Sequence, residues 1–404
     1  MRILELFGGI GACSKALEQL GIEYEIADYV EIDKYAVKSF NAIHDTNFEP
    51  QNICEWDKDI EVDLIMHGSP CQDFSLAGNQ AGGDEGSGTR SSLMYETIRI
   101  VKKIKPKYVI WENVKNLISK KHKHNFDAYI EKMDMLGYNS YYQVLNAKDY
   151  GIPQNRERVF TISIRKDIDD GLFKFPNKVE LKIKLKDMLE ENVDEKYYLS
   201  DAMLNYIVAD NEKWTGNNDK SLINKNIASA INTGEGSRRC DASNYVSDQF
   251  EENYDLKNIS YLRKFGSKGK LQEKDYCDTL TASMGTGGGN VPILKIKNAT
   301  KQGYLEAEDG DGIDVSSRME YHRGTVQKGI IQTLDSLGGK SKGVVLNDLR
   351  IRKLTPLETW KLMGFDAKDF NKAKASGVSD TQLYKQAGNS IVVNVLKAIL
   401  NNLL

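Results

Sequence analysis

The residue best suited to nucleophilic chemistry is Cys71, in the segment Gly68-Ser69-Pro70-Cys71-Gln72. This segment follows the strand expected at 62–67, and open α/β sheets bind ligands beyond the carboxyl ends of their strands. A structural cysteine prefers an apolar element, whereas this one follows a proline in a loop. The stretch 74–92 is long and rich in glycine and serine, which predicts a mobile lid or a plain surface loop. The pattern therefore favours a reactive thiolate.

A carboxylate is expected at the same edge of the sheet as Cys71, and two guanidinium groups lie close together further along the chain. Glu112 follows the strand expected at 108–111, and a carboxylate near a thiol and a desolvated ring can act as an acid. Arg156 and Arg158 lie two residues apart on an extended segment and so share a face. They could hold a reacting ring and a nearby phosphate. The alternatives are a solvated Glu112 and a surface cluster of salt bridges.

The N-terminal segment Phe7-Gly8-Gly9-Ile10-Gly11 predicts a strand that opens through glycines into a helix. Glycines let a ligand touch the main chain, and the following helix N-terminus supplies free N–H groups. The spacing is not G-x-G-x-x-G, which disfavours a nicotinamide site, and a tight turn without a ligand would also fit. Glu31, expected at the end of the second strand, could bind both hydroxyls of a ribose.

Strands and helices that alternate along the chain would position these residues. The expected strands are 3–7, 24–32, 62–67, 108–111, 141–145 and 159–164, and the expected helices are 12–20, 34–41, 91–104 and 125–136. This order predicts a mostly parallel sheet with helices on both faces. Further helices are expected at 356–364, 381–386 and 390–400. Ser and Asn are good N-caps, so residues 386–390 are expected to cap the last helix.

Between these two helical parts the chain is rich in Gly, Asn, Ser and Asp, with short strand-like pieces. Fragments 227–233, 278–286 and 331–338 indicate weak strand–loop–strand repeats, unless their likeness is coincidence. The changes in texture predict three segments: 1–171, 172–345 and 346–404. Seven candidate cations are scattered through the middle segment, where they could pair with its abundant acidic residues. They are Arg238, Arg239, Arg263, Lys264, Lys268, Arg318 and Arg323.

Composition excludes several classes of protein. With 404 residues, 40% hydrophobic and 28% charged, the chain has the make-up of a multidomain globular protein. Its net charge of −3 excludes a general polycation, although a basic cleft can coexist with an acidic surface. Five scattered cysteines without a C-x-x-C pair argue against a disulfide framework or a structural zinc. His122 and His124 are expected in a solvated basic loop, not a metal site. No apolar run or leader suggests a membrane, so a cytoplasmic protein is expected.

Taken in this order, the motifs resemble those of the DNA cytosine-5 methyltransferases, and the middle segment most resembles the phage-associated bacterial members. The resemblance implies an α/β fold with a Rossmann-like S-adenosylmethionine-dependent methyltransferase sheet. It also implies a smaller, irregular, mostly β target recognition domain at 172–345, whose scattered cations could hold phosphates or recognise guanine. The implied catalytic residues are Cys71, Glu112, Arg156 and Arg158. The residues implied to hold S-adenosyl-L-methionine are Phe7, Gly8, Gly9, Gly11, Glu31, Ile32, Asn52, Ile53, Pro70, Asn389 and Ser390. The family commonly has Asp-Ile where this chain has Asn52-Ile53, and Asn keeps an acceptor oxygen.

The family mechanism implies a role for each catalytic residue. The thiolate of Cys71 would add to carbon 6 of a flipped-out cytosine, which activates carbon 5 for methylation. Glu112 would contact ring nitrogen 3 and the exocyclic amine. Arg158 would hold the carbonyl at position 2, and Arg156 would help hold phosphate and the loop.

The resemblance implies double-stranded DNA as the partner, in a monomeric enzyme without a metal or a membrane. It leaves open a cognate restriction endonuclease. The nearest alternative is a tRNA cytosine-5 methyltransferase, against which the long middle segment argues. A non-catalytic DNA-binding homologue is another, and the intact set of catalytic residues argues against it.

Overall fold

The computed structural model describes residues 1–70, 74, 83–198, 259–263, 270–273, 290–300, 303–308, 310–314, 325–333, 342–345 and 351–404. Its largest sheet has the strand order β2-β1-β3-β4-β7-β5. β2, β1, β3 and β4 are parallel neighbours, whereas β7 runs antiparallel to both β4 and β5. The strands are β1 (Arg2–Leu6), β2 (Glu25–Val30), β3 (Leu64–His67), β4 (Tyr108–Val114), β5 (Tyr138–Asn146) and β7 (Glu157–Arg165). The predicted mostly parallel sheet, with its added strand pair, is confirmed.

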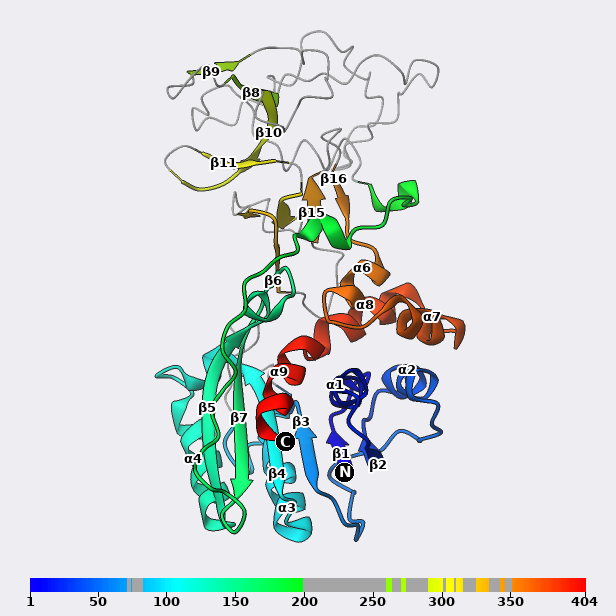
Figure 1. The fold of residues 1–404 in the computed structure, drawn as a ribbon, viewed down its shortest axis with the longest axis vertical. Coiled ribbons are helices and arrows are strands. Elements are labelled where there is room, and N and C mark those ends of the chain that lie inside the picture. The colour runs from blue at the N-terminus through cyan, green and yellow to red at the C-terminus, as the bar shows by residue number, and fades with distance from the viewer. Residues whose placement is uncertain are drawn as a thin grey trace, which may run out of the picture.

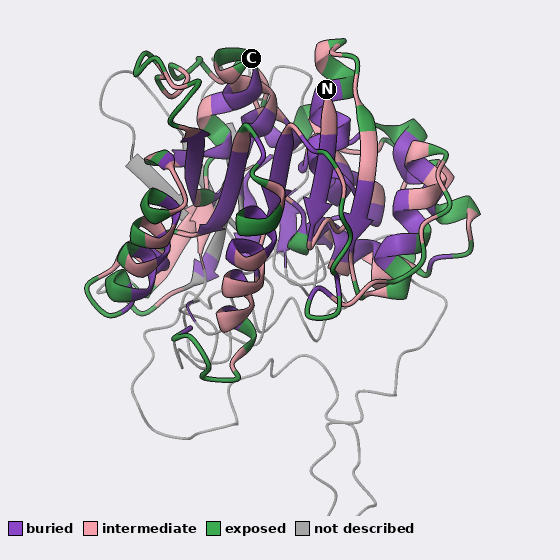
Figure 2. Cartoon of the chain, turned by 90° about the horizontal axis from the view of Figure 1, so that it is seen from below, coloured by how far each residue is buried: buried purple, intermediate pink, exposed green. Residues whose placement is uncertain are grey.

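Helices cover both faces of this sheet (Figure 1). α1 (Ala12–Leu20) and α9 (Val393–Leu403) share one apolar cluster with β1, β3 and β4, while α3 (Met94–Ile104) and α4 (Lys123–Met135) share the other. α2 (Lys34–His44) packs on α7 (Ala367–Ala375). Successive strand residues point to opposite faces, so a sheet covered on both sides needs continuous apolar strands. All four residues of β3 are buried for this reason, and Figure 2 shows buried strands behind helices with exposed outer sides.

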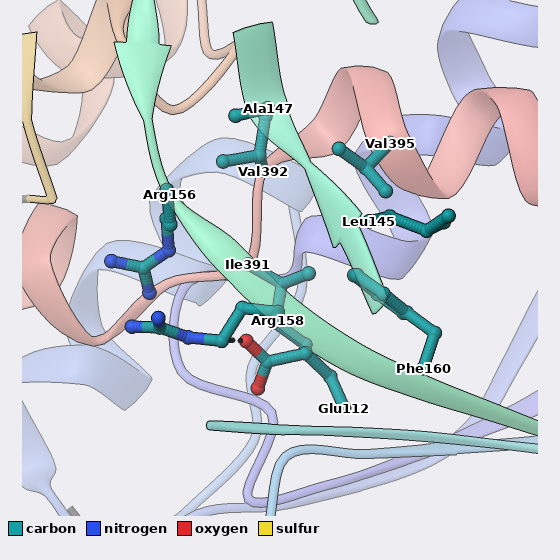
Figure 3. Close-up of a pocket in the computed structure, with 9 residues that line it drawn as sticks. All are labelled: Glu112, Leu145, Ala147, Arg156, Arg158, Phe160, Ile391, Val392 and Val395. Carbon is teal, nitrogen blue, oxygen red and sulfur yellow. Dashed lines mark ion pairs between the residues drawn. The ribbon is translucent and has the colours of Figure 1, made fainter. Parts of the chain in front are cut away.

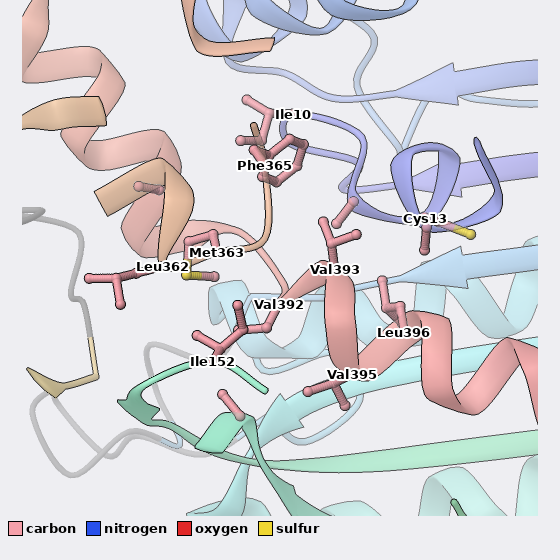
Figure 4. Packing of buried hydrophobic residues seen from close by; sticks show 14 of the residues in the cluster. Ile10, Cys13, Ile152, Leu362, Met363, Phe365, Val392, Val393, Val395 and Leu396 are labelled. Atoms are coloured by element: carbon pink, nitrogen blue, oxygen red, sulfur yellow. The ribbon is translucent and has the colours of Figure 1, made fainter. Parts of the chain in front are cut away.

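The C-terminal helices return to the sheet, as predicted. Val393 and Leu396 of α9 pack towards Ile10 and Cys13 at the start of α1 (Figure 4). Before them come α6 (Pro356–Lys361), α7 and α8 (Asp380–Asn389). Helix α7 was not predicted from the sequence, because its buried face is narrow and its residues are mostly polar. Asp366 begins this helix with a capping box to Asp369, a signal that the sequence contained.

The expected cap of the last helix is wrong. Residues 386–389 belong to the end of α8, and Ser390 is the C-cap of that helix. α9 starts later, with Val392 at its N-cap position and no side-chain cap. Ser390 therefore ends α8 and does not begin α9. The start of α9 is determined by burial of its apolar face and not by a capping side chain.

Apart from β14, the described strands of the middle segment, together with β16 just after it, form two four-stranded sheets, β11-β10-β8-β9 and β13-β12-β15-β16. Their bounds are β8 (Ile259–Arg263), β9 (Lys270–Glu273), β10 (Asn290–Lys297), β11 (Tyr304–Ala307), β12 (Gly312–Asp314), β13 (Val326–Gln327), β15 (Lys342–Val345) and β16 (Ile351–Lys353). The predicted smaller, mostly β region is confirmed, and Figure 1 shows β11, β15 and β16 above the upper edge of the main sheet. Fragments 227–233 and 278–286 lie outside the described residues. So do all seven candidate cations except Arg263, whose main chain is in β8.

Short contacts attach the middle segment to the main sheet. β14 (Ile331–Gln332) pairs in parallel with β6 (Gln154–Asn155), and Thr333 Oγ1 donates to the Asn155 carbonyl at 2.9 Å. At the other end of the segment, Phe173 and Phe175 pack against the α1–α9 cluster. The boundaries at 171/172 and 345/346 stay predictions, because residues inside the middle segment, near each of its ends, also contact the part of the chain that forms the main sheet.

The described 3-10 helices are η1 (Arg90–Leu93), η2 (Lys115–Ile118), η3 (Ala147–Tyr150), η4 (Leu185–Met188) and η5 (Glu195–Tyr197).

Candidate active site

The loop between β1 and α1 requires its glycines. Phe7, Gly9 and Gly11 all have positive φ, and a Cβ at Gly8 would lie 2.6 Å from the Tyr29 ring. Nothing lies within 4 Å of the place that a Gly9 Cβ would take, so a ligand can approach the main chain there. Tyr29 Oη donates to the Gly9 carbonyl at 2.6 Å and fixes the loop.

Glu31 lies against this loop at the carboxyl end of β2. Its two carboxylate oxygens accept from the Gly9 N–H at 3.2 Å and the Asp33 N–H at 2.8 Å. Burial raises the pKa of the Glu31 carboxyl, although those two main-chain donors act in the opposite direction. Ile32, the next residue, is 70% exposed. An acceptor for hydroxyls thus lies beside an uncovered apolar side chain, which suits a ribose followed by an aromatic base.

Residues 51–53 join the same corner. The Gln51 N–H donates to the Glu31 carbonyl at 2.8 Å. Asn52 turns inward to its own loop, where Oδ1 accepts from the Cys54 N–H at 3.1 Å. The Ile53 side chain is buried in the α3–α4 cluster, and its carbonyl accepts from Arg99 Nη2 at 2.9 Å. The assignment of Asn52 and Ile53 to the cofactor stays a prediction.

The segment of the expected nucleophile follows β3. Gly68, Ser69 and Pro70 are described, whereas Cys71 and Gln72 lie outside the described residues, as do residues 75–82 of the expected lid. A Cβ at Gly68 would lie 3.5 Å from Ile391 Cδ1 and 3.8 Å from Glu112 Oε2. The chain that leads into Cys71 therefore passes directly beside Glu112.

Glu112 and Arg158 form an ion pair across β4 and β7. Arg158 Nε lies 3.0 Å from Glu112 Oε1, and the two side chains are 17% and 11% exposed, respectively (Figure 3). The antiparallel register places Arg158 opposite Val114 at the end of β4, which brings the two charges to the same edge. The sequence predicted the edge at which Glu112 lies, and the structure adds Arg158 to that edge, while the catalytic roles of both residues stay predictions.

The pair lies in a small, mostly apolar hollow that is partly open to solvent. Its other lining residues are Leu145, Ala147, Arg156, Phe160, Ile391, Val392 and Val395. A carboxylate and a guanidinium held among apolar side chains can make strong, oriented hydrogen bonds to a planar polar ring. Ile391, Val392 and Val395 were not predicted as site residues, although the apolar run after Ser390 was a usable signal.

Arg156 makes a different set of contacts. Its side chain is buried, and Nη2 donates to the Ser390 carbonyl at 2.7 Å and the Gly388 carbonyl at 3.3 Å. Its main-chain N–H donates to Asn146 Oδ1 at 3.1 Å. In this structure Arg156 thus ties the β6–β7 junction to the end of α8, and its predicted role at a phosphate stays a prediction.

The end of α8 also connects to the Glu31 corner. Lys385 Nζ lies 2.6 Å from Asp33 Oδ2, and Gln386 Nε2 donates to the Tyr35 carbonyl at 2.9 Å. Asn389 is exposed, while Ser390 is buried. The segment 389–392 therefore runs from the glycine-loop side of the edge to the Glu112 hollow.

The basic segment at the start of α4 differs from the predicted solvated loop. His124 lies in the first turn of α4, not in a loop, although its side chain is exposed as expected and its Nε2 lies 3.0 Å from Asp84 Oδ1. His122 is 2% exposed and meets the Phe74 ring edge-on, so the prediction of a solvated side chain is wrong for it. A fully buried Phe74 needs apolar cover, and the His122 ring supplies part of it.

Comparison with known proteins gives consistent results. A family model described as C-5 cytosine-specific DNA methylase matches residues 1–404. The orphan methyltransferase M.SPRI of Bacillus phage SPR is 33% identical over 456 aligned positions, which cover 100% of this chain and 97% of that protein. The type II methyltransferase M2.ScrFI of Lactococcus lactis subsp. cremoris is 30% identical, with 100% and 99% covered.

Solved structures support the fold alone. The Dnmt2 methyltransferase of S. pombe superimposes with a TM-score of 0.54 at 18% identity, covering 100% of this chain and 98% of that one. The methyltransferase EhMeth of Entamoeba histolytica gives 0.53 at 16% identity, with 100% and 97% covered. Among the described helices, none is long and apolar enough to cross a bilayer.

Proposed function

The chain belongs to the C-5 cytosine-specific DNA methylase family and is a DNA cytosine methyltransferase, and from this premise we propose how it acts. It transfers a methyl group from S-adenosylmethionine to carbon 5 of a cytosine flipped out of a specific short duplex sequence. The reaction passes through a covalent adduct with Cys71. The observation that carries this proposal is the Glu112–Arg158 pair in its apolar hollow, beside the chain that leads into Cys71.

The nucleophile solves the central problem of the reaction. Carbon 5 of cytosine is too weakly nucleophilic to displace a methyl group from a sulfonium unaided. When the thiolate of Cys71 adds to carbon 6, a carbon–sulfur bond forms and electron density moves towards carbon 5 and the ring. After methylation, loss of the carbon 5 proton and departure of the thiolate restore the aromatic ring.

Glu112 and Arg158 stabilise the charge that this addition creates. Glu112 holds ring nitrogen 3, to which it supplies a proton or a hydrogen bond, and accepts from the exocyclic amine. Arg158 donates to the carbonyl at position 2 and keeps that oxygen in the plane of the ring. Their 3.0 Å contact fixes both groups before the substrate enters, and preorganised charges are the most effective kind in catalysis.

The corner formed by the glycine loop, Glu31 and Ile32 fits S-adenosylmethionine. Glu31 would accept from the ribose hydroxyls, Ile32 would cover the adenine, and the open main chain at Gly9 would face the amino acid part of the cofactor. When bound, the cofactor supplies a methyl group on a positively charged sulfur. Pro70, Asn389 and Ser390 lie on the segments between this corner and the hollow, and complete the proposed set.

Duplex DNA is the proposed substrate, and the ring cannot be reached inside a base-paired stack. Flipping the cytosine out costs a few kcal/mol, which contacts in the hollow would offset. The segment 172–345 is the proposed target recognition domain, since the proposed catalytic residues lie outside it. Loops on its strands would contact base edges in the major groove.

Replacing Cys71 tests this function. Cys71→Ser should lose methyl transfer while it retains cofactor affinity, because a hydroxyl is far less ionised than a thiol near neutral pH. Cys54→Ser is the matched control, since Cys54 is an exposed free cysteine, and it should keep full activity. The wild type should form a stable adduct with duplex DNA that carries 5-fluorocytosine.

Transfer of a labelled methyl group to duplex DNA, to tRNA or to neither distinguishes the three competing functions. Bisulfite sequencing of DNA from an expressing host would then give the recognised sequence. Turnover by Cys71→Ser near the wild-type rate, or wild-type protein that forms no adduct, would refute the proposed mechanism.

A further inference from the structure

Two side chains of β4 hold Ser69, which lies two residues before Cys71. Trp111 Nε1 donates to Ser69 Oγ at 2.9 Å, and Asn113 Nδ2 donates to the Ser69 carbonyl at 3.3 Å. All three residues are buried. Trp111 and Asn113 are two apart on the strand and share a face, while Glu112 between them points to the hollow. One strand therefore carries the carboxylate on one side and holds the nucleophile's segment on the other.

A second contact holds Phe74, which lies three residues after Cys71. Asn116 of η2, which follows β4 directly, donates through Nδ2 to the Phe74 carbonyl at 2.6 Å. The Phe74 ring is fully buried, and a Cβ at Gly83 would lie 2.5 Å from it. His122 covers the ring edge at 5.4 Å between centroids. Phe74 is therefore fixed both by its main chain and by its ring.

Other rings pack against Trp111 and hold it towards Ser69. Its ring contacts those of Tyr129, at 4.1 Å between centroids, and His67, at 5.6 Å and nearly parallel to it. His67 is fully buried, and its Nε2 lies 3.1 Å from Tyr129 Oη. Burial lowers the pKa of His67 to about 3, so this ring is neutral and packs without a charge. The indole N–H consequently has one fixed direction.

We propose that Trp111 and Asn116 are positioning residues that set the place of the nucleophile relative to Glu112. Trp111 acts through Ser69 and Asn116 acts through Phe74, so β4 and η2 hold the chain on both sides of Cys71. This inference rests on the proposed role of Cys71. A misplacement of about 1 Å in an attacking group can cost about 100-fold in rate, although no contact with the substrate is lost.

A double-mutant cycle tests the Trp111–Ser69 contact. Trp111→Phe keeps an aromatic ring and removes the N–H donor, while Ser69→Ala removes the acceptor and leaves the core around Trp111 intact. The rate of adduct formation with 5-fluorocytosine duplex should fall roughly 10- to 100-fold in each single variant. The double variant should be no slower than the slower single one, because either change breaks the same bond. Cofactor affinity should stay within about twofold of the wild type.

Trp360→Phe is the matched control for lost stability. Trp360 is also fully buried, and its Nε1 donates to the Leu383 carbonyl at 2.9 Å. This variant should lose a comparable amount of thermal stability and keep the wild-type rate of adduct formation. Asn116→Ala should slow adduct formation in the same way as Ser69→Ala, without an effect on cofactor affinity.

The possible outcomes separate the two proposals. Wild-type rates of adduct formation in Ser69→Ala and Asn116→Ala would overturn the positioning roles. They would also be overturned if the double variant were slowed by the product of the factors measured for Trp111→Phe and Ser69→Ala alone, because the two changes would then act independently. An equal slowing in Trp360→Phe would assign the effect to stability and would also overturn them. Wild-type protein that forms no adduct refutes the role of Cys71 itself, which is a different result.

Discussion

Arg156 lies where the predicted cofactor and base sites meet, and its replacement tests how the two depend on each other. Its buried guanidinium donates from one nitrogen to the carbonyls of Ser390 and Gly388, at 2.7 and 3.3 Å. Arg156→Lys keeps the positive charge but has a compact ammonium in place of a planar fork. The segment 388–392 then loses at least one charge-assisted hydrogen bond.

The size of the effect follows from that bond. A hydrogen bond with a charged partner contributes about 1.5–3 kcal/mol, which corresponds to roughly 10- to 150-fold in an equilibrium constant. In the variant, binding must first order a segment that the wild type already holds in place. Affinity for S-adenosylmethionine should therefore fall by an amount within this range, and adduct formation at Cys71 should slow as well.

Calorimetric titration of the cofactor, with and without duplex DNA, measures the first effect. Arg165→Lys is the control, because Arg165 ends the same strand at the opposite edge and pairs there with Asp167. That variant should match the wild type in both affinity and rate. If Arg156→Lys binds the cofactor with wild-type affinity and forms adduct at the wild-type rate, Arg156 does not link the two sites and the reasoning is wrong.

Three further replacements test other parts of the site and of the core. Glu112→Gln keeps the size of the side chain and removes its charge, so steady-state kinetics with duplex DNA should show a kcat that is roughly 100- to 10,000-fold lower; a loss below tenfold would contradict the assigned role. Glu31→Ala should weaken S-adenosylmethionine binding by about 1.5–3 kcal/mol in calorimetry, and an unchanged affinity would count against this corner as the cofactor site. Burial raises the pKa of Glu5 to about 7, so the folded chain binds a proton more tightly than the unfolded chain, whose ordinary value is 4.5. The stabilisation that follows from this tighter proton binding by Glu5 is complete below about pH 4.5 and is lost as the pH rises through about 7, which lowers the free energy of unfolding by about 3 kcal/mol. Glu5→Gln should flatten this part of the pH dependence in denaturant unfolding between pH 5 and 8, and an unaltered slope would show that Glu5 does not cause it.

The sequence by itself determined the order of elements in the first half and the edge at which the site lies. Runs such as 62–67, with Leu64, Ile65 and Met66 at its centre, are mostly apolar, which a strand covered on both faces requires, and helical spacing separates them. Because these patterns are local, they predicted β1, β3 and β4, and with them the placing of Glu112 and Pro70 at one edge. The sequence did not predict helix α7, because its narrow buried face, with Phe370 and Ala373, produces little apolar periodicity.

Only the tertiary structure decided how the two arginines differ. Arg156 and Arg158 are the same residue type in one short segment, and no local pattern distinguishes them. Arg158 contacts Glu112 because β7 pairs with β4. Arg156 donates to carbonyls more than 230 positions away, because α9 packs on α1 and the end of α8, which precedes α9 directly, therefore lies beside Arg156. The same packing brings Ile391 and Val392 into the wall of the hollow. Hydrogen-bond partners and pocket walls of this kind depend on which distant surfaces bury one another, and that is a property of the whole packed core.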